Sequence, residues 1–364
     1  MSTAASRVLV IAEAGVNHNG SLERALAMID AAAAAGADCV KFQTFQASEL
    51  ASSRAPKAAY QLANTDAAQS QVEMLSQLQL SPSDHEALQA HAAHRRVGFL
   101  STPFDLPSLR LLTQRLGMQL LKVPSGEITN GPFLLEVART GRDAIVSTGM
   151  SSLGEVETAL AVLAFGYTEQ SAGCAPGGEA FSKAYASAAG HRALRQKVRL
   201  LHCTSEYPAP FAEVNLLAMD TLAAAFGLPV GLSDHTPGTH IALAAVARGA
   251  CVIEKHFTLD RALPGPDHTA SLEPPELALM VRNIRDVESA LGEGIKHPTA
   301  SEARNRAVAR KHLVATRKIT AGESFSRDNV GAKRAGAGLS PMEYWSVLGQ
   351  SAARDFEPDE PISV

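Results

Sequence analysis

Two lysines lie inside stretches of sequence that otherwise predict buried strands. Lys41 stands in the run CVKFQT and Lys122 in the run LLKVPSG. An unpaired ammonium group is costly to bury, so each lysine needs an anionic partner. That partner is either a carboxylate of the chain, from Glu13, Glu127 or Glu254, or a bound phosphate or carboxylate. We favour a bound anion, because hydroxyl side chains cluster beside the lysines.

Hydroxyl-bearing residues recur at the ends of the apolar runs. A single serine at the end of a strand usually belongs to a turn or a cap. Several at the ends of successive strands can instead donate hydrogen bonds to one small dianion. The residues of this set are Ser101, Thr102, Ser125, Ser147, Thr148 and Ser233.

Two histidines end two further runs, His235 in GLSDHTPG and His256 in CVIEKHF. Neighbouring strands in a sheet lie about 4.8 Å apart, so both imidazoles can reach one ion. The pair predicts a divalent metal site, although a lone histidine in a strand is usually a core residue. We expect Mn²⁺, with Mg²⁺ or Co²⁺ as alternatives; zinc stays open as well, although a structural zinc site would use more thiolate or imidazole ligands. His202 lies deeper in its run and predicts a structural hydrogen bond or a substrate contact.

Acidic and aromatic residues complete the candidate chemistry. Glu13, Glu127 and Glu254 can act as a general base or bind a sugar hydroxyl, or each can neutralise a lysine. Tyr207 in SEYPAP and Asp267 in PGPDH follow the sixth and eighth apolar runs. A polyol would find donors and acceptors there, but either residue can also brace a loop.

The elements that must position these residues alternate along the chain. Short apolar runs rich in β-formers are separated, for the most part, by Ala- and Leu-rich segments with helical periodicity. Ser21 predicts one helix start and Ser81 another. Polar residues end every run and no GxGxxG follows the first, which favours an α/β fold of the (β/α)8 TIM-barrel type over a doubly wound sheet. The predicted strands are 8–15, 39–44, 98–103, 120–126, 144–149, 199–205, 229–234 and 251–257.

The character of the sequence changes near residue 291. We predict a TIM-barrel catalytic domain over 1–291, a polar linker over 292–309 and a small domain of short strands and turns over 310–364. Two long connections interrupt the barrel. The connection 45–80 lies at the rim where substrate lids occur, and 166–197 is interpreted as a surface insertion without a function.

Composition and charge exclude several classes of protein. Of the 364 residues, 46% are hydrophobic and 19% are charged, which indicates a folded protein with a sizeable core. A net charge of -4 gives no overall field for nucleic acid or an acidic membrane. Without a leader-like or membrane-spanning run, we expect a cytoplasmic protein. Cys39, Cys203 and Cys251 lie in apolar runs, so we expect buried thiols.

Together the motifs resemble the sialic acid synthase family, phosphoenolpyruvate-dependent condensing enzymes that make nine-carbon acidic sugars. In the tail, KITAGE, KRAGAG and SPMEYW resemble the family's antifreeze-like SAF domain, a β-clip fold. A likeness over nearly the whole chain is far more specific than one motif. The other motifs are IAEAGVNHNGS, GADCVKFQTF, APKAAYQ, FLSTPFD, LKVPSGE, VSTGM, LHCTSEYPAP, GLSDHT, EKHFTLD and GPDH.

The resemblance implies that phosphoenolpyruvate condenses with open-chain N-acetylmannosamine to give N-acetylneuraminic acid and phosphate. Glu13, His235 and His256 would be catalytic, the two histidines by binding the metal that polarises the aldehyde and Glu13 by assisting the attacking water. The residues implied for phosphoenolpyruvate are Lys41, Thr102, Lys122, Ser125, Ser147, Ser205 and Ser233. Those implied for the sugar are Gln43, Glu127, Tyr207, Glu254, Asp267 and Arg334.

The resemblance also implies a domain-swapped homodimer, in which the SAF domain caps the partner's active site and Arg334 reaches the acetamido group. Ala335 replaces the usual proline of the KRPG loop and Ala337 a common asparagine, which predicts a less rigid loop. Ser205 stands where relatives have Asn or Thr. These differences concern ligand contacts more than the reaction.

Three alternatives stay open. A synthase of N,N'-diacetyllegionaminic acid, acting on 2,4-diacetamido-2,4,6-trideoxymannose, fits the APKAAYQ and SQVEML segments equally well. A metal-dependent aldolase using free pyruvate would share the barrel and the histidines but would not need a dianion site around Lys41 and Lys122. A non-enzymatic ice- or sugar-binding protein would leave the histidine pair and the buried lysines unexplained.

Overall fold

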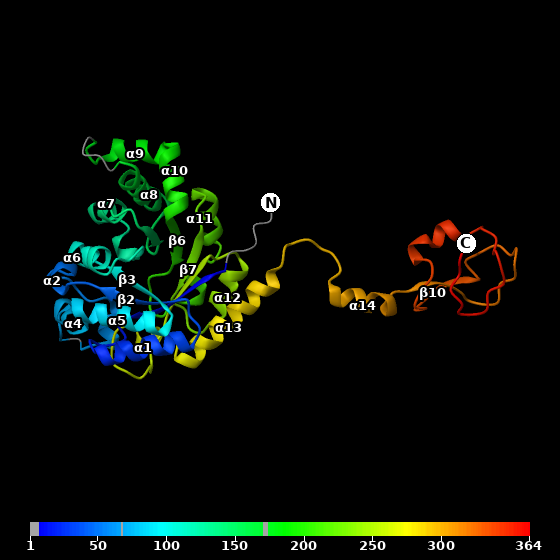
Figure 1. Cartoon of the computed structure of the whole chain (residues 1–364), viewed down its shortest axis with the longest axis horizontal. Helices are drawn as coiled ribbons and strands as arrows, with labels where there is room; N and C mark the ends of the chain where they lie inside the picture. Colours follow the sequence, from blue (N-terminus) through cyan, green and yellow to red (C-terminus); the bar gives the residue numbers. More distant parts are fainter. Residues whose placement is uncertain (1–6, 67, 170–173) are drawn as a thin grey trace. The chain divides into compact units, whose positions relative to one another are not determined.

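Eight parallel strands with helices outside them form the first of two compact units in the computed structural model, which describes residues 7–66, 68–169 and 174–364 (Figure 1). The units are Met1–Glu293 and Gly294–Val364. Strand order follows the chain and β1 pairs with β8, which confirms the predicted TIM barrel; in the described part of the chain no ladder joins β3 to β4. The strands are β1 (Leu9–Gly15), β2 (Cys39–Thr44), β3 (Gly98–Pro103), β4 (Leu120–Val123), β5 (Asp143–Ser147), β6 (Val198–Cys203), β7 (Val230–Asp234) and β8 (Val252–His256).

The helices between the strands start where the sequence predicts. The Ser21 side chain accepts a hydrogen bond from Arg24 N at 3.2 Å, and Ser81 caps the next long helix in the same way. Short 3₁₀ turns, η2 (Ser125–Glu127), η3 (Phe211–Glu213) and η4 (His268–Ala270), follow strands β4, β6 and β8. The main helices are α1 (Leu22–Ala34), α5 (Pro82–Arg95), α6 (Leu106–Arg110) with the π-helical turn η1 (Leu111–Arg115), α7 (Gly131–Arg139), α8 (Leu153–Thr168), α11 (Ala218–Phe226), α12 (His240–Ala247) and α13 (Pro274–Leu291).

Both long connections contain helices. The segment after β2 forms α2 (Ala47–Leu50), α3 (Ala59–Asn64) and α4 (Gln71–Leu78). Residues 166–197, interpreted from the sequence as a surface insertion, complete α8 and form α9 (Gly178–Ala186) and α10 (Ala188–Lys197), with 170–173 outside the described residues. Phe181 packs edge-on against Phe165 of α8, with ring centres 5.2 Å apart. Alanine favours helices, and the helices α9 and α10 pack against α8.

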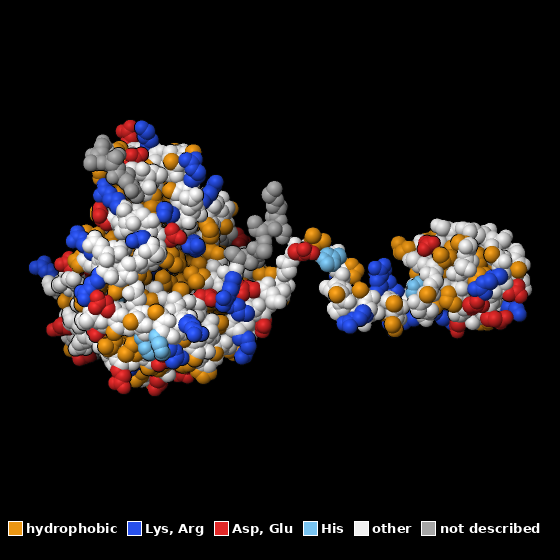
Figure 2. All heavy atoms as spheres, viewed as in Figure 1, with side chains coloured by type: hydrophobic (Ala, Val, Ile, Leu, Met, Phe, Trp, Pro, Cys, Tyr) orange, Lys and Arg blue, Asp and Glu red, His pale blue; other side chains and the backbone are white. Residues whose placement is uncertain are grey.

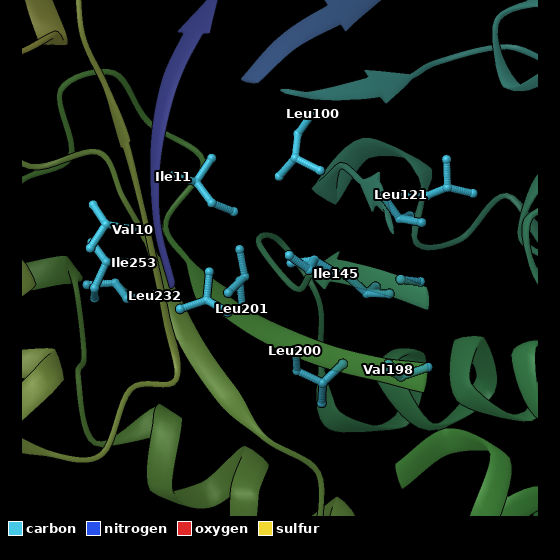
Figure 3. Packing of buried hydrophobic residues seen from close by; sticks show 14 of the residues in the cluster. Val10, Ile11, Leu100, Leu121, Ile145, Val198, Leu200, Leu201, Leu232 and Ile253 are labelled. Atoms are coloured by element: carbon cyan, nitrogen blue, oxygen red, sulfur yellow. The ribbon is translucent and has the colours of Figure 1, made fainter. Parts of the chain in front are cut away.

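The barrel interior is apolar below and polar above. Ile11, Leu100, Ile145 and Leu201 are buried and point into the barrel (Figure 3). Because side chains alternate along a strand, the residues two positions further on point the same way. Those residues are Glu13, Thr102, Ser147 and Cys203. The apolar layer therefore closes the floor beneath a polar layer at the carboxyl ends of the strands.

The second unit has its own small core. It contains α14 (Ala300–Ala309), the antiparallel strands β9 (His312–Ala315) and β10 (Val330–Lys333), the turn η5 (Pro341–Glu343) and α15 (Tyr344–Val347). Phe325 and Phe356 pack in that core with ring centres 6.0 Å apart. On the face drawn in Figure 2, positive and negative side chains are interspersed over both units. No helix of the described residues is long and apolar enough to cross a membrane.

Gly231 of β7 tests the barrel packing, because a Cβ there would lie 2.3 Å from the backbone oxygen of Val252 and 2.8 Å from Leu201 Cδ2. Strand spacing would have to widen, so Gly231→Ala should destabilise the protein by about 3 kcal/mol. Gly154→Ala is the control, because a Cβ on that α8 residue meets nothing within 4 Å. Thermal unfolding should show a lower melting temperature for the first variant alone; equal values would contradict the packing argument.

Candidate active site

A cavity of about 490 Å³ opens at the carboxyl end of the barrel. Every strand contributes a residue to its lining, one from each of β1 to β8 in turn: Glu13, Lys41, Thr102, Lys122, Ser147, Cys203, Ser233 and Glu254. Further predicted site residues that line it are Gln43, Ser125, Ser205, Tyr207, His235, His256 and Asp267. The predicted residues that are not among the lining residues are Glu127, Arg334, Ser101 and Thr148.

Four predicted residues lie elsewhere. Glu127 is in turn η2 and accepts a hydrogen bond from Asn130 Nδ2 at 2.7 Å, and Arg334 is exposed in the second unit. Two of the six hydroxyls also point away. Ser101 bonds to the Thr44 hydroxyl at 2.6 Å on the outer face of the barrel, and Thr148 donates to the Leu201 carbonyl at 3.0 Å.

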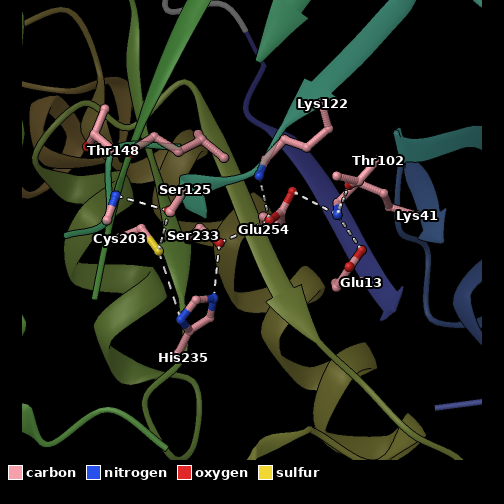
Figure 4. Close-up of polar contacts among 12 residues, drawn as sticks. Glu13, Lys41, Thr102, Lys122, Ser125, Thr148, Cys203, Ser233, His235 and Glu254 are labelled. Atoms are coloured by element: carbon pink, nitrogen blue, oxygen red, sulfur yellow. Dashed lines mark hydrogen bonds and ion pairs between the residues drawn. The ribbon is translucent and has the colours of Figure 1, made fainter. Parts of the chain in front are cut away.

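Both lysines are paired with carboxylates of the chain (Figure 4). Lys41 Nζ lies 2.8 Å from Glu13 Oε2 and 3.7 Å from Glu254 Oε2, and it donates to Thr102 Oγ1 at 2.9 Å. Lys122 Nζ lies 3.4 Å from Glu254 Oε1. The sequence left two kinds of partner open for the lysines, a carboxylate of the chain or a bound anion. The structure shows carboxylates, from Glu13 and Glu254 but not from Glu127. The cluster also faces an open cavity.

The two glutamates have opposite ionisation behaviour. Burial raises the pKa of Glu13 to about 7, against the opposing charge of Lys41. Burial alone would also raise the pKa of Glu254, but Lys122 and Lys41 together hold it at about 2. Burial likewise lowers the pKa of Lys122, whereas for Lys41 the two carboxylates outweigh burial and raise its pKa. Glu254 is therefore the permanent counterion, and protonation of Glu13 gives the cluster a net positive charge.

Hydroxyl groups around the lysines are ready to donate hydrogen bonds. Ser147 Oγ is buried, and within the described residues it has no hydrogen-bond partner. Ser125 Oγ accepts from the Gly149 backbone N–H at 3.0 Å and lies 3.7 Å from Cys203 Sγ. Ser233 Oγ donates to Glu254 Oε1 at 3.0 Å. A small dianion above the lysines would supply the acceptor that the Ser147 hydroxyl lacks.

The two histidines suit a divalent metal ion, although they do not form a complete site. Their ring centres are 5.5 Å apart. His235 Nδ1 lies 2.7 Å from the Thr204 carbonyl, which can only accept, so Nδ1 carries a proton and Nε2 has the lone pair when the ring is neutral. His256 Nδ1 is buried without a hydrogen-bond partner among the described residues, 3.7 Å from Asp267 Oδ2. No three His, Cys, Asp or Glu side chains in the described ranges form a metal-binding group.

Tyr207 and Asp267 border the histidine pair. The Tyr207 ring stacks on His235 with centres 4.1 Å apart and meets His256 edge-on at 5.5 Å. Burial raises the pKa of Asp267 to about 6. Burial lowers the pKa of His256, and Lys41 and a protonated His235 add to this effect. Burial and these nearby cations therefore favour a neutral imidazole on His256, the form that binds metals.

Sequence analysis missed two groups of lining residues. Cys203 was assigned to the core, yet it faces the cavity, and its position two residues after the interior Leu201 was the available signal. Burial raises the pKa of its thiol, but His235 at 3.9 Å and Ser125 lower it overall. The connection 45–80, which we call the lid, contributes a second group; the motifs APKAAYQ and SQVEML in it were the available signal. Its members are Leu50, Ala51, Ala58, Gln61, Gln71, Met74, Leu75 and Leu78.

Comparison with known proteins places the chain in the NeuB family, whose match covers residues 28–296, with an SAF domain at 310–363. The N,N'-diacetyllegionaminic acid synthase of Campylobacter jejuni is 49% identical over 98% of this chain and 99% of that protein. Its namesake in Legionella pneumophila is 43% identical over 93% of this chain and 89% of that protein. The N-acetylneuraminic acid (sialic acid) synthetase structure from Leptospira borgpetersenii has a TM-score of 0.66 at 34% identity, covering 82% of this chain and 90% of that chain.

The chain therefore belongs to the NeuB family. This confirms the predicted family, the barrel followed by an SAF domain, and an enzyme of the sugar-acid synthase class. Of the two predicted products, the relatives at 49% and 43% identity favour the one named as the alternative.

Lys122→Met tests the anion site. Removing this ammonium group leaves Glu254 with Lys41 alone at 3.7 Å, so repulsion between Glu254 and a bound anion should grow. We expect the Kd for inorganic phosphate, measured by calorimetry, to rise at least about tenfold. Lys197→Met is the matched control. Lys197 Nζ donates a hydrogen bond to the Gly141 carbonyl at 2.7 Å, and Lys197 is not among the residues that line the cavity. An unchanged Kd in folded Lys122→Met would remove Lys122 from the site.

Proposed function

We propose that this enzyme condenses phosphoenolpyruvate with 2,4-diacetamido-2,4,6-trideoxymannose to give N,N'-diacetyllegionaminic acid and phosphate. The observation that supports the reaction is the cluster of Lys41 and Lys122 with hydroxyl groups beneath an open cavity. A site of this kind suits a dianionic substrate and speaks against an aldolase that uses free pyruvate. Membership of the family likewise speaks against a non-enzymatic binding protein.

The choice of sugar reverses our first expectation, N-acetylmannosamine. Relatives named as N,N'-diacetyllegionaminic acid synthases are 49% and 43% identical, whereas the human N-acetylneuraminate-9-phosphate synthase is 31% identical. The lid supports the same choice, since Leu50, Met74, Leu75 and Leu78 line the cavity. A sugar with a second acetamido group and a methyl at C6 has more apolar surface than N-acetylmannosamine, and such a lining would bind it better.

In the proposed reaction, C3 of phosphoenolpyruvate attacks the aldehyde carbon of the open-chain sugar and water adds to C2. Glu13 accepts the proton of that water, and C–O cleavage then expels phosphate. A divalent ion bound by His235 and His256, which we propose is Mn²⁺, with Mg²⁺ or Co²⁺ as alternatives, would supply Lewis-acid polarisation of the aldehyde oxygen. Tyr207, stacked on His235, fixes the plane of that imidazole.

Phosphoenolpyruvate binding is assigned to the two lysines and the cavity hydroxyls. Its phosphate and carboxylate would accept hydrogen bonds from Ser147 and from the lysines. The remaining proposed contacts are Thr102, Ser125, Ser205 and Ser233. Glu254 is the counterion of both lysines, so we assign it to the phosphoenolpyruvate-binding group of residues and not primarily to sugar binding.

Sugar binding is assigned to further residues of the cavity lining. Gln43, Tyr207 and Asp267 line the cavity and offer donors and acceptors for hydroxyl and acetamido groups. Glu127 would need to change its contact with Asn130 to take part. We also propose, from the family resemblance, that Arg334 reaches the acetamido group across a domain-swapped homodimer.

Substrate preference is the direct test of the proposal. With Mn²⁺ and phosphoenolpyruvate, phosphate release and product mass should show a kcat/KM at least about tenfold higher for the diacetamido sugar than for N-acetylmannosamine. His235→Ala in the same assay should lose metal-dependent turnover. A preference for N-acetylmannosamine would instead make the enzyme an N-acetylneuraminate synthase, and no release with either sugar would refute the reaction.

The ionisation of Glu13 predicts the pH profile. As a base Glu13 must be deprotonated, and with a pKa raised to about 7 by burial, kcat/KM should fall as pH drops through about 7. Glu13→Gln should lose about 10²- to 10⁴-fold in rate, and its residual activity should lack this acid limb. The comparison also controls for ionisation of phosphoenolpyruvate, which both proteins share. An identical limb in the variant would exclude Glu13 as the titrating group.

A further inference from the structure

A buried charge pair lies on the outer face of β7 and β8, turned away from the cavity. Lys255 is 0% exposed and Asp234 2% exposed, and Lys255 Nζ lies 2.9 Å from Asp234 Oδ2. The two residues are ladder partners, and one step earlier along the same face stand the buried Leu232 and Ile253. A buried ion pair is often no more stabilising than an apolar pair of the same volume. Stability alone therefore gives little reason for this pair.

The pair fixes the first residue after His235. Asp234 Oδ1 accepts hydrogen bonds from the Thr236 backbone N–H at 2.9 Å and from the Thr236 hydroxyl at 2.7 Å. Lys255 Nζ donates to the Thr236 carbonyl. We call these contacts of Asp234, Thr236 and Lys255 the β7–β8 clamp. Through the backbone N–H and carbonyl of Thr236, the clamp connects the turn that follows β7 to the side chain of Lys255 on β8.

Each charged member of the clamp directly precedes a histidine of the cavity. Because side chains alternate, Asp234 and Lys255 point outward while His235 and His256 point inward. The backbone carbonyl of His235 is held by the Ala209 N–H at 2.9 Å and its ring by the Thr204 carbonyl at 2.7 Å. With the clamp behind it, His235 is fixed at its ring and on both sides of its backbone. Figure 4 shows this ring directed at Ser233, within the cavity lining.

We propose that the β7–β8 clamp is a positioning device that sets the separation of His235 and His256 and thereby the affinity of the site for a divalent cation. Groups that orient metal ligands from behind commonly change metal affinity by about 10- to 100-fold. The clamp residues lie outside the cavity lining, so any effect they have on a bound ion must act through the histidines. The inference rests on the proposed function in one respect, that the two histidines bind the metal.

The double variant Asp234→Asn/Lys255→Met separates positioning from stability. Asn keeps an oxygen for Thr236 and Met keeps the length of Lys, so the tie between the strands is lost without leaving an unpaired charge. Such replacements are often neutral for stability, and we expect a melting temperature within a few degrees of wild type. The Kd of the full-length protein for Mn²⁺ alone, followed by electron paramagnetic resonance, should rise at least about tenfold. In turnover assays kcat should fall, with the KM for phosphoenolpyruvate within about twofold.

The matched control makes the same substitutions in an ion pair at the other end of the barrel. Arg285 Nη2 of α13 lies 2.6 Å from Asp38 Oδ2, just before β2. Asp38→Asn/Arg285→Met should leave the Kd for Mn²⁺ and kcat unchanged. Thr236→Val is a milder second variant, which removes one hydroxyl hydrogen bond of the clamp and should weaken Mn²⁺ binding about threefold. It keeps the test decisive if the double variant does not fold.

Three outcomes are distinguishable. Weaker Mn²⁺ binding in folded clamp variants, with the control unchanged, supports the proposal. Wild-type affinity and kcat in the folded clamp variants overturn it and leave the proposed function intact. If wild type and His235→Ala fail equally to bind Mn²⁺, the metal role of the histidines fails, and the clamp proposal fails with it.

Discussion

Two ammonium groups buried beside one cavity are the constraint on which the rest of the site depends. Lys41 and Lys122 are 3% and 4% exposed, and charges in such surroundings require close opposite charges. Glu254 meets that need permanently, whereas Glu13, with a pKa of about 7, meets it only in part at neutral pH. The charges of the cluster are thus largely balanced without a ligand, and a bound anion would stabilise the two ammonium groups further. That balance suits phosphoenolpyruvate, whose phosphate must bind and later leave.

The barrel supplies this balance through strand alternation. Each strand contributes at least one residue to the cavity, and buried apolar residues such as Ile11, Leu100 and Leu201, two positions earlier, exclude water from below. A low local dielectric strengthens every contact among the charged groups above. The same alternation places Asp234 and Lys255 on the opposite face of β7 and β8, behind the histidines. The two faces of these strands can therefore have separate roles. The inner face holds the two histidines, and the outer face holds the residues proposed to position them.

The sequence predicted the barrel because strands and helices differ in hydrophobic period, and it predicted most of the site because polar residues end every strand. It did not choose among Glu13, Glu127 and Glu254 as partners of the lysines, since that depends on which side chains share the interior. It missed Cys203 because a thiol in an apolar run suggests a core residue. Within the segment interpreted as a surface insertion it did not identify α9 and α10, because short helices depend on tertiary packing more than on composition.

The distribution of residues between strands and loops explains why the reaction is easier to infer than the sugar. Groups proposed to bind phosphoenolpyruvate lie on or directly after strands, whose geometry the barrel fixes. Groups from the lid, such as Leu50, Met74 and Leu75, lie on short helices of a long connection that tolerates substitution. A change of sugar therefore requires new lid contacts but no change in the charged residues at the strand ends. Specificity within this family should accordingly vary at the lid while the chemistry stays at the strand ends.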